Sequence, residues 1–128
     1  MIIIDTDVLI EIFDKKSKRG DEALEQIIKS GENFAITVIN LHEILYGLIK
    51  YANTKPIKHI LKLPTLNYTK KDAQLAAKLE IEAERKGKPI RRTDAIIAAI
   101  TINANAKLYT FNKKHFQPLQ PLGLKLFP

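Results

Sequence analysis

The sequence lacks cysteine and any long apolar run. None of its 128 residues is cysteine, which excludes a disulfide framework, a thiolate zinc site and a cysteine nucleophile. No apolar stretch approaches the ~18 residues that a membrane span requires. The apolar start of the chain is interrupted by Asp5, so it is too short for a signal peptide. We therefore expect one cytoplasmic domain, residues 1–128, with no membrane association.

The chain is also poor in acidic residues relative to basic ones. It has 21 Lys and Arg against 14 Asp and Glu, a formal net charge of +7. Such an excess favours a polyanionic partner or substrate such as RNA. A lysine-rich surface that only keeps the protein in solution explains the excess equally well.

Short apolar segments alternate with amphipathic helices along the whole chain. Apolar and β-branched runs predict strands at residues 1–4, 34–39, 65–68, 107–111 and 124–127. Apolar residues at helical spacing predict helices at 8–13, 21–30, 40–51, 57–61, 70–86 and 93–104. This alternation predicts an α/β fold, a three-layer sandwich with a central parallel sheet of about five strands.

Four polar residues lie at or near predicted strand-to-helix junctions: Asp5, Glu43, Asp94 and Asn112. Each has a structural explanation when taken singly. Asp5 or Asp7 is suited to cap the first helix, Asn40-x-x-Glu43 resembles a capping box, and Asp94 suits the dipole of a helix start.

Taken together, the three acids indicate a metal site. The carboxyl ends of parallel strands meet at one edge of a sheet, where ligands bind in open α/β folds. Carboxylates gathered there repel one another and stay ionised only beside a cation. Oxygen ligands without cysteine favour Mg²⁺, with Mn²⁺ as a substitute. Beside a basic surface, such an ion points to phosphodiester chemistry.

Four segments also resemble a known family. They are IIDTDVLI (3–10), TVINLHEILYG (37–47), GKPI leading to DAIIAA (87–99), and LYTFNKKHF (108–116). In this order they resemble PIN domains, most closely the small ribonuclease toxins of the VapC type found in toxin-antitoxin pairs, and they span nearly the whole chain.

The resemblance implies a magnesium-dependent endoribonuclease on a PIN-like sheet of order 3-2-1-4-5. It makes Asp5, Glu43 and Asp94 the metal-binding acids and Asn112 the fourth position of the site, with supporting positions at Thr6, Asp7 and Thr37. Many relatives carry Asp where this chain has His115, which leaves a second metal and the role of His115 open. The resemblance also implies a homodimer and an inhibiting VapB-like antitoxin.

Basic residues near the predicted site are candidates for contacts to RNA phosphates. These are Arg91, Arg92, Lys113 and Lys114. A second basic region consists of Lys55, Lys58, Lys62, Lys70 and Lys71. Both groups also fit solvated connectors.

Two other functions remain open. The Asp5-Thr6-Asp7 segment fits the first motif of haloacid dehalogenase-like phosphatases, with Asp5 as nucleophile and Asp7 as acid and base. That family needs a downstream acidic pair, yet Asp94 has no acidic neighbour closer than Glu84. The second alternative is a non-catalytic module that binds RNA or a partner and uses its acids only as helix caps.

Overall fold

A parallel five-stranded sheet forms the centre of the protein. The computed structural model describes all 128 residues. The strands are β1 (Ile2–Ile4), β2 (Phe34–Thr37), β3 (Thr65–Leu66), β4 (Lys107–Tyr109) and β5 (Lys125–Phe127). Their order is β3-β2-β1-β4-β5 and every pairing is parallel. The predicted α/β class and the strand order 3-2-1-4-5 are confirmed.

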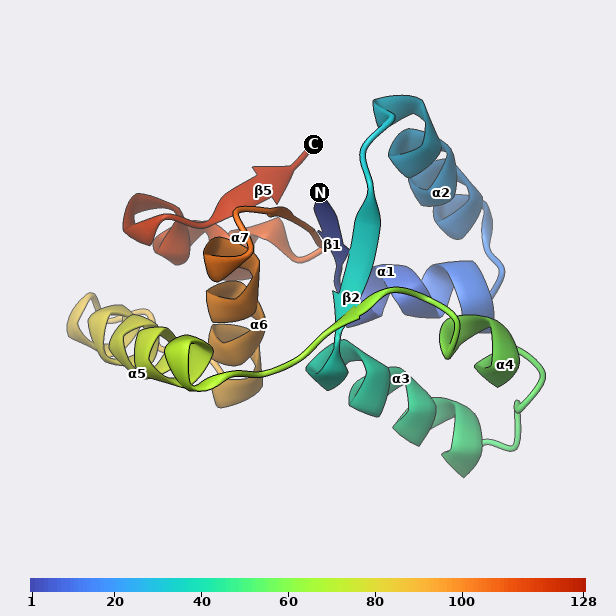
Figure 1. Cartoon of the computed structure of the whole chain (residues 1–128), viewed down its shortest axis with the longest axis horizontal. Helices are drawn as coiled ribbons and strands as arrows, with labels where there is room; N and C mark the ends of the chain where they lie inside the picture. The colour runs from blue at the N-terminus through green and yellow to red at the C-terminus, as the bar shows by residue number, and fades with distance from the viewer.

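Helices cover both faces of this sheet (Figure 1). They are α1 (Thr6–Leu9), α2 (Lys18–Ser30), α3 (Val38–Lys50), α4 (Ile57–Ile60), α5 (Lys70–Arg85), α6 (Arg92–Asn103) and α7 (Lys113–Phe116). A π-helical segment, η1 (Ile10–Asp14), follows α1, and a 3-10 segment, η2 (Gln117–Leu122), follows α7.

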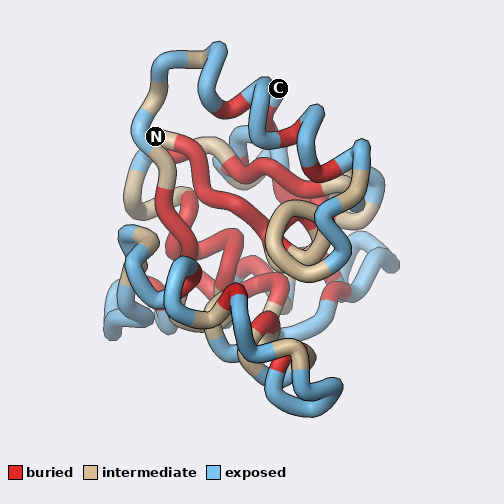
Figure 2. Tube along the Cα trace, turned by 90° about the vertical axis from the view of Figure 1, so that its right-hand side faces the viewer, coloured by how far each residue is buried: buried red, intermediate tan, exposed pale blue.

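Alternate residues of β1 divide the core into two clusters. Ile3 packs in a cluster with side chains of α5 and α6. Ile2 and Ile4 pack in the other cluster, with side chains of α1, α2, α3 and α4. This division follows from the twofold side-chain period of a strand. Figure 2 shows the strands as a buried centre enclosed by helices whose outer sides are exposed. The predicted three layers are therefore confirmed.

Helix α2 packs unusually close to η1. A Cβ atom at Gly20 would lie 2.2 Å from the carbonyl oxygen of Glu11. Only glycine permits this approach. The sequence predicts this helix from residue 21, but it already begins at Lys18. Ser17 accepts a hydrogen bond from Gly20 N and caps the helix three residues earlier.

The boundary between β2 and α3 also differs from the prediction. The strand ends at Thr37, not Ile39, and α3 begins at Val38, not Asn40. Thr37 is the N-cap and Asn40 the third helical residue, and each side chain accepts a hydrogen bond from the other's backbone N–H. The predicted capping box, Asn40-x-x-Glu43, is therefore wrong, because Thr37 supplies a cap three residues earlier.

Two further results concern the helices. The predicted helices do not include α7 and η2, which lie between β4 and β5. No helix combines the length and apolar character needed to cross a bilayer.

Candidate functional site

The candidate residues meet in one cavity at the carboxyl edge of the sheet. Its volume is about 280 Å³. The lining comes from the end of β1, from α1, η1 and α3, and from the start of α6 and the α7 segment. Its residues are Asp5, Thr6, Asp7, Ile10, Glu43, Arg91, Asp94, Asn112 and Phe116. The four principal candidates of the sequence are therefore neighbours in space, as the edge of a parallel sheet requires.

Asp5 lies directly after β1 and is almost completely buried. Its Oδ1 accepts hydrogen bonds from Thr6 N at 2.9 Å and from Asn40 Nδ2 at 3.3 Å. Burial, with the charges of Asp7 and Asp94, raises the pKa of Asp5 to about 7. The cavity thus holds a carboxyl group whose charge lacks compensation, which is the situation that a bound cation relieves.

Asn40 holds this part of the site together. Its amide is fully buried, and its Oδ1 accepts hydrogen bonds from the backbone N–H and the hydroxyl of Thr37. Its Nδ2 donates to Asp5 Oδ1 and, at 3.1 Å, to Thr6 Oγ1. Thr37 therefore acts on Asp5 through Asn40.

Sequence reasoning missed Asn40 as a site residue. Its position three residues after Thr37 was the available signal, because that spacing is typical of a helix cap. Asn40 also lies one helical turn before Glu43, so both side chains are on the same side of α3.

Glu43 is held by a threonine from a different element. Thr6 Oγ1 donates to Glu43 Oε1 at 2.7 Å. Because Asn40 donates to the same hydroxyl, Asn40, Thr6 and Glu43 form a continuous chain of hydrogen bonds. The carboxylate one turn into α3 is thereby connected to the end of β1.

Asp7 is tied to the loop after β4. Its Oδ2 accepts hydrogen bonds from Phe111 N at 3.1 Å and from Thr110 Oγ1 at 3.4 Å, and Thr110 Oγ1 in turn accepts from Asn112 N. Burial raises the pKa of Asp7, and its Oδ1 is buried without a hydrogen-bond partner. Thr110, which sequence reasoning also missed, thus connects Asp7 to the backbone of Asn112.

Asp94, in the first turn of α6, is engaged by two basic side chains. Arg91 donates from Nε to Oδ2 at 3.0 Å and from Nη2 to Oδ1 at 3.3 Å. His115 Nε2 lies 2.8 Å from the same Oδ2. His115 therefore contacts a candidate acid directly and is not a detached surface residue.

The donor chemistry of the cavity fits a hard divalent cation. Three acids, the unpartnered oxygen of Asp7 and the amide of Asn112 are oxygen donors of the kind that Mg²⁺ and Mn²⁺ prefer. The side chains do not yet form a closed site, since no three acidic or histidine groups are close enough together to hold one ion. The hydrogen bonds of Asp94 to Arg91 and of Glu43 to Thr6 occupy oxygens that an ion would need.

The other basic candidates do not line this cavity. Arg92 forms an ion pair with Glu80, with Nε 3.1 Å from Oε1, and neither Lys113 nor Lys114 lines the cavity.

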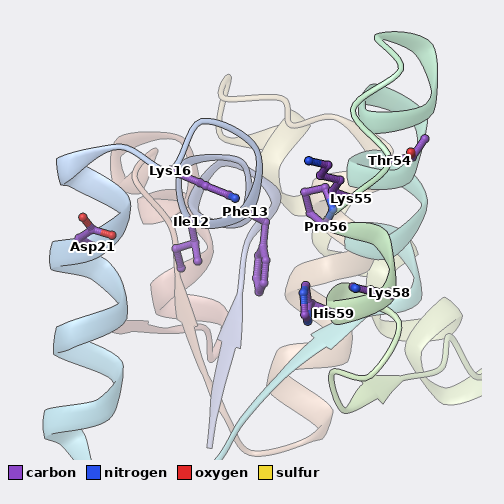
Figure 3. Close-up of a pocket in the computed structure, with 9 residues that line it drawn as sticks. All are labelled: Ile12, Phe13, Lys16, Asp21, Thr54, Lys55, Pro56, Lys58 and His59. Carbon is purple, nitrogen blue, oxygen red and sulfur yellow. The ribbon is translucent and has the colours of Figure 1, made fainter.

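Lys55 and Lys58 belong instead to a separate hollow of about 640 Å³. In Figure 3, Lys16 lies on one side of Phe13, and Lys55 and Lys58 lie on the other. This hollow shares no lining residue with the acidic cavity. Lys55 and Lys58, of the second basic region, therefore line a surface that is separate from the acidic cavity.

Fold and cavity together define a small α/β domain with an acidic site at the carboxyl edge of its sheet. The family model described as PIN domain matches residues 2–118. The chain belongs to the PIN domain family. This assignment favours the nuclease reading over the phosphatase alternative.

Relatives of known name support the assignment over the full length. "Ribonuclease VapC1" of Methanocaldococcus jannaschii is 30% identical over 127 residues, which cover 98% of this chain and 86% of the relative. "Ribonuclease VapC2" of Rickettsia felis is 28% identical over 128 residues, which cover 96% of this chain and 95% of the relative. The crystal structure of VapBC2 from Rickettsia felis, bound to a DNA fragment from its promoter, contains a chain with a TM-score of 0.83 and 28% identity, covering 99% of this chain and 98% of that one.

Proposed function

We propose that this protein is a metal-dependent endoribonuclease and the toxin of a VapBC-type toxin-antitoxin pair. The observation that carries the proposal is the convergence of Asp5, Glu43 and Asp94, from three separate elements, on one cavity. The PIN family and the two relatives named as ribonucleases supply the substrate class.

The three acids hold Mg²⁺, or Mn²⁺ in its place, and Asn112 completes the site. A bound divalent cation offsets the charge of the acids and stabilises the charge that develops on a phosphodiester during attack by water. Asp5 and Asp94 are buried at fixed positions, at the start of α1 and in the first turn of α6. They therefore hold their carboxylates with little conformational freedom.

Thr6, Asn40 and Thr37 orient the acids. Their hydrogen bonds fix Asp5 and Glu43 relative to each other. Such supporting contacts are typically worth 10–100-fold in metal affinity or activity. Asp7 keeps the loop that carries Asn112 beside the cavity through Phe111 N.

The basic surface suits RNA as the substrate. A net charge of +7 attracts the phosphate backbone without reading its sequence. Lys113 and Lys114 directly follow Asn112, which lines the cavity. They are therefore candidates to guide an RNA strand toward it. We place the protein in the cytoplasm, because the proposed substrate, RNA, is found there.

An antitoxin partner follows from the same comparisons. The structure from Rickettsia felis is a complex of a VapB with a VapC. We extend that arrangement to this chain, as a homodimer inhibited by a VapB-like protein that covers the acidic cavity. Inhibition is physically needed, because a free basic ribonuclease damages the RNA of its own cell.

The test is RNA cleavage by the purified chain with Mg²⁺, with Mn²⁺ and with EDTA. We expect cleavage with either ion and none with EDTA. Asp94→Asn keeps the size of the side chain but removes its charge, and we expect it to lower the cleavage rate at least about 100-fold.

Asp21→Asn is the matched control, because Asp21 is an exposed aspartate in the first turn of α2. It should cleave as the wild type does. Cleavage that persists in EDTA, or an Asp94→Asn variant of full activity, would refute the proposed mechanism. RNA binding without cleavage under every condition would support the non-catalytic alternative.

A further inference from the structure

Arg91 clamps one of the proposed metal-binding acids. Its Nε and Nη2 donate to the two different oxygens of Asp94, at 3.0 and 3.3 Å. This fork-to-carboxylate arrangement is the strong form of an ion pair. The two side chains differ sharply in environment, since that of Asp94 is 5% exposed and that of Arg91 is 71% exposed.

The guanidinium also lies in the field of the other acids. Its hydrogen bonds and charge interaction with Asp94 raise the pKa of Arg91, and the charges of Glu43 and Asp5 add to this effect. One positive group therefore interacts with all three carboxylates of the cavity. This is the electrostatic role that the proposed metal ion would have.

A divalent cation would compete with this guanidinium for the same two oxygens of Asp94. With a bond from Arg91 on each oxygen and His115 on Oδ2, the carboxylate has little remaining capacity. The acids correspondingly do not form a closed three-ligand group. Moving the guanidinium off Asp94 frees Oδ1 completely and leaves only His115 on Oδ2.

We propose that Arg91 competes with the metal ion for Asp94, so that the ion binds only when the guanidinium is released. This inference rests on the proposed metal site. Arg91 is then a positioning residue that sets the metal concentration at which the cavity fills. In the metal-free protein it also offsets part of the repulsion among the acids.

Release of Arg91 requires no change in the fold. The residue precedes α6, makes no side-chain cap, and extends a mostly exposed side chain. Asp94 stays fixed in the first turn of the helix. The freed guanidinium remains at the cavity, where it is placed to contact a phosphate of bound RNA.

The experiment measures Mn²⁺ binding by calorimetry, without RNA, for the wild type, Arg91→Ala and Arg92→Ala. The adjacent Arg92 is a close control, because it has the same charge and forms a similar two-bond pair, but with Glu80 outside the cavity. We expect Arg91→Ala to bind Mn²⁺ roughly three- to tenfold more tightly, the size expected for a bidentate pair with one exposed partner. Arg92→Ala should stay within about twofold of the wild type.

Arg91→Lys gives a second measure that keeps the charge. Lysine lacks the planar fork and holds a carboxylate less firmly, so its Mn²⁺ affinity should lie between those of the wild type and Arg91→Ala. Unchanged or weaker Mn²⁺ binding by a folded Arg91→Ala, with normal binding by the wild type, overturns the inference and leaves the proposed function intact. Absence of Mn²⁺ binding by all four proteins removes the metal site, and the inference with it.

Discussion

Replacing Asp5 by Asn should make the metal-free protein more stable while it abolishes cleavage. Asp5 is 7% exposed, and burial beside Asp7 and Asp94 raises its pKa from 3.8 to about 7. The folded protein therefore holds a proton that the unfolded chain releases between these two values, so stability falls as the pH rises through this window. At pH 8 the full cost is present.

The size of the effect follows from the pKa change. A change from 3.8 to about 7 corresponds to about 4 kcal/mol at ~1.4 kcal/mol per pKa unit. Asp7 shares part of this cost because the two carboxyl groups repel each other, so we expect Asp5→Asn to gain about 2 to 4 kcal/mol at pH 8. Asparagine keeps an oxygen in place of Oδ1 to accept the bonds from Thr6 N and Asn40 Nδ2.

Urea unfolding in EDTA at pH 8 and pH 5 measures this gain. The advantage of Asp5→Asn should shrink at pH 5, and Mn²⁺ should stabilise the wild type but not the variant. Asp72→Asn provides the opposite case. Asp72 is 5% exposed, and burial by itself raises its pKa. Hydrogen bonds from Asn103 and Thr69 outweigh burial, so the pKa of Asp72 is lowered overall. That variant should lose stability at pH 8. Equal or lower stability of Asp5→Asn at pH 8 would refute the argument.

Two other substitutions test the support of the acids and the packing of α2, the second with a control. Asn40→Ala removes the amide that joins Asp5 and Thr6. Its Mn²⁺ affinity, measured by calorimetry, and its RNA cleavage rate should each fall about 10–100-fold. Wild-type values would mean that the acids need no such support. Gly20→Ala places a Cβ 2.2 Å from a backbone oxygen, and thermal unfolding should show a loss of about 1 to 3 kcal/mol. Gly47→Ala is its control, because the added methyl meets nothing within 4 Å apart from its own stretch of helix. A helical alanine gains about 0.5–1 kcal/mol over glycine, and equal Tm values for the two variants would contradict the close packing.

The strands and the helices of the sandwich were accessible from the sequence because their patterns are local. Apolar runs at 2–4 and 107–109 and the helical stripe of α5 are regular, and each appears where it is expected. Boundaries were less accessible, because they depend on caps that compete. Thr37 ends β2 two residues early by capping α3, and Ser17 starts α2 inside a charged stretch.

The candidate acids were accessible for a related reason. Asp5 and Glu43 follow predicted strands, and parallel topology brings the carboxyl ends of those strands to one edge. Asp94 opens a helix that follows another helix, so its place at the same edge was expected from the resemblance to PIN domains. The hydrogen-bond partners of the acids could not be predicted from the sequence. The pairs Thr6–Glu43 and Thr110–Asp7 join residues that are far apart in the chain. No spacing rule links such positions.

By itself, the sequence determined the layered α/β architecture, because strand and helix periodicities are local. The strand order and the three acids of one site followed from the resemblance of four of its segments to PIN domains. Only the tertiary structure decided which groups contact those acids. Asn40 bonds to Asp5 and Arg91 bonds to Asp94, and burial sets the pKa of Asp5. Contacts and desolvation of this kind depend on distances of a few ångströms across the folded chain, which a linear pattern of residues does not contain.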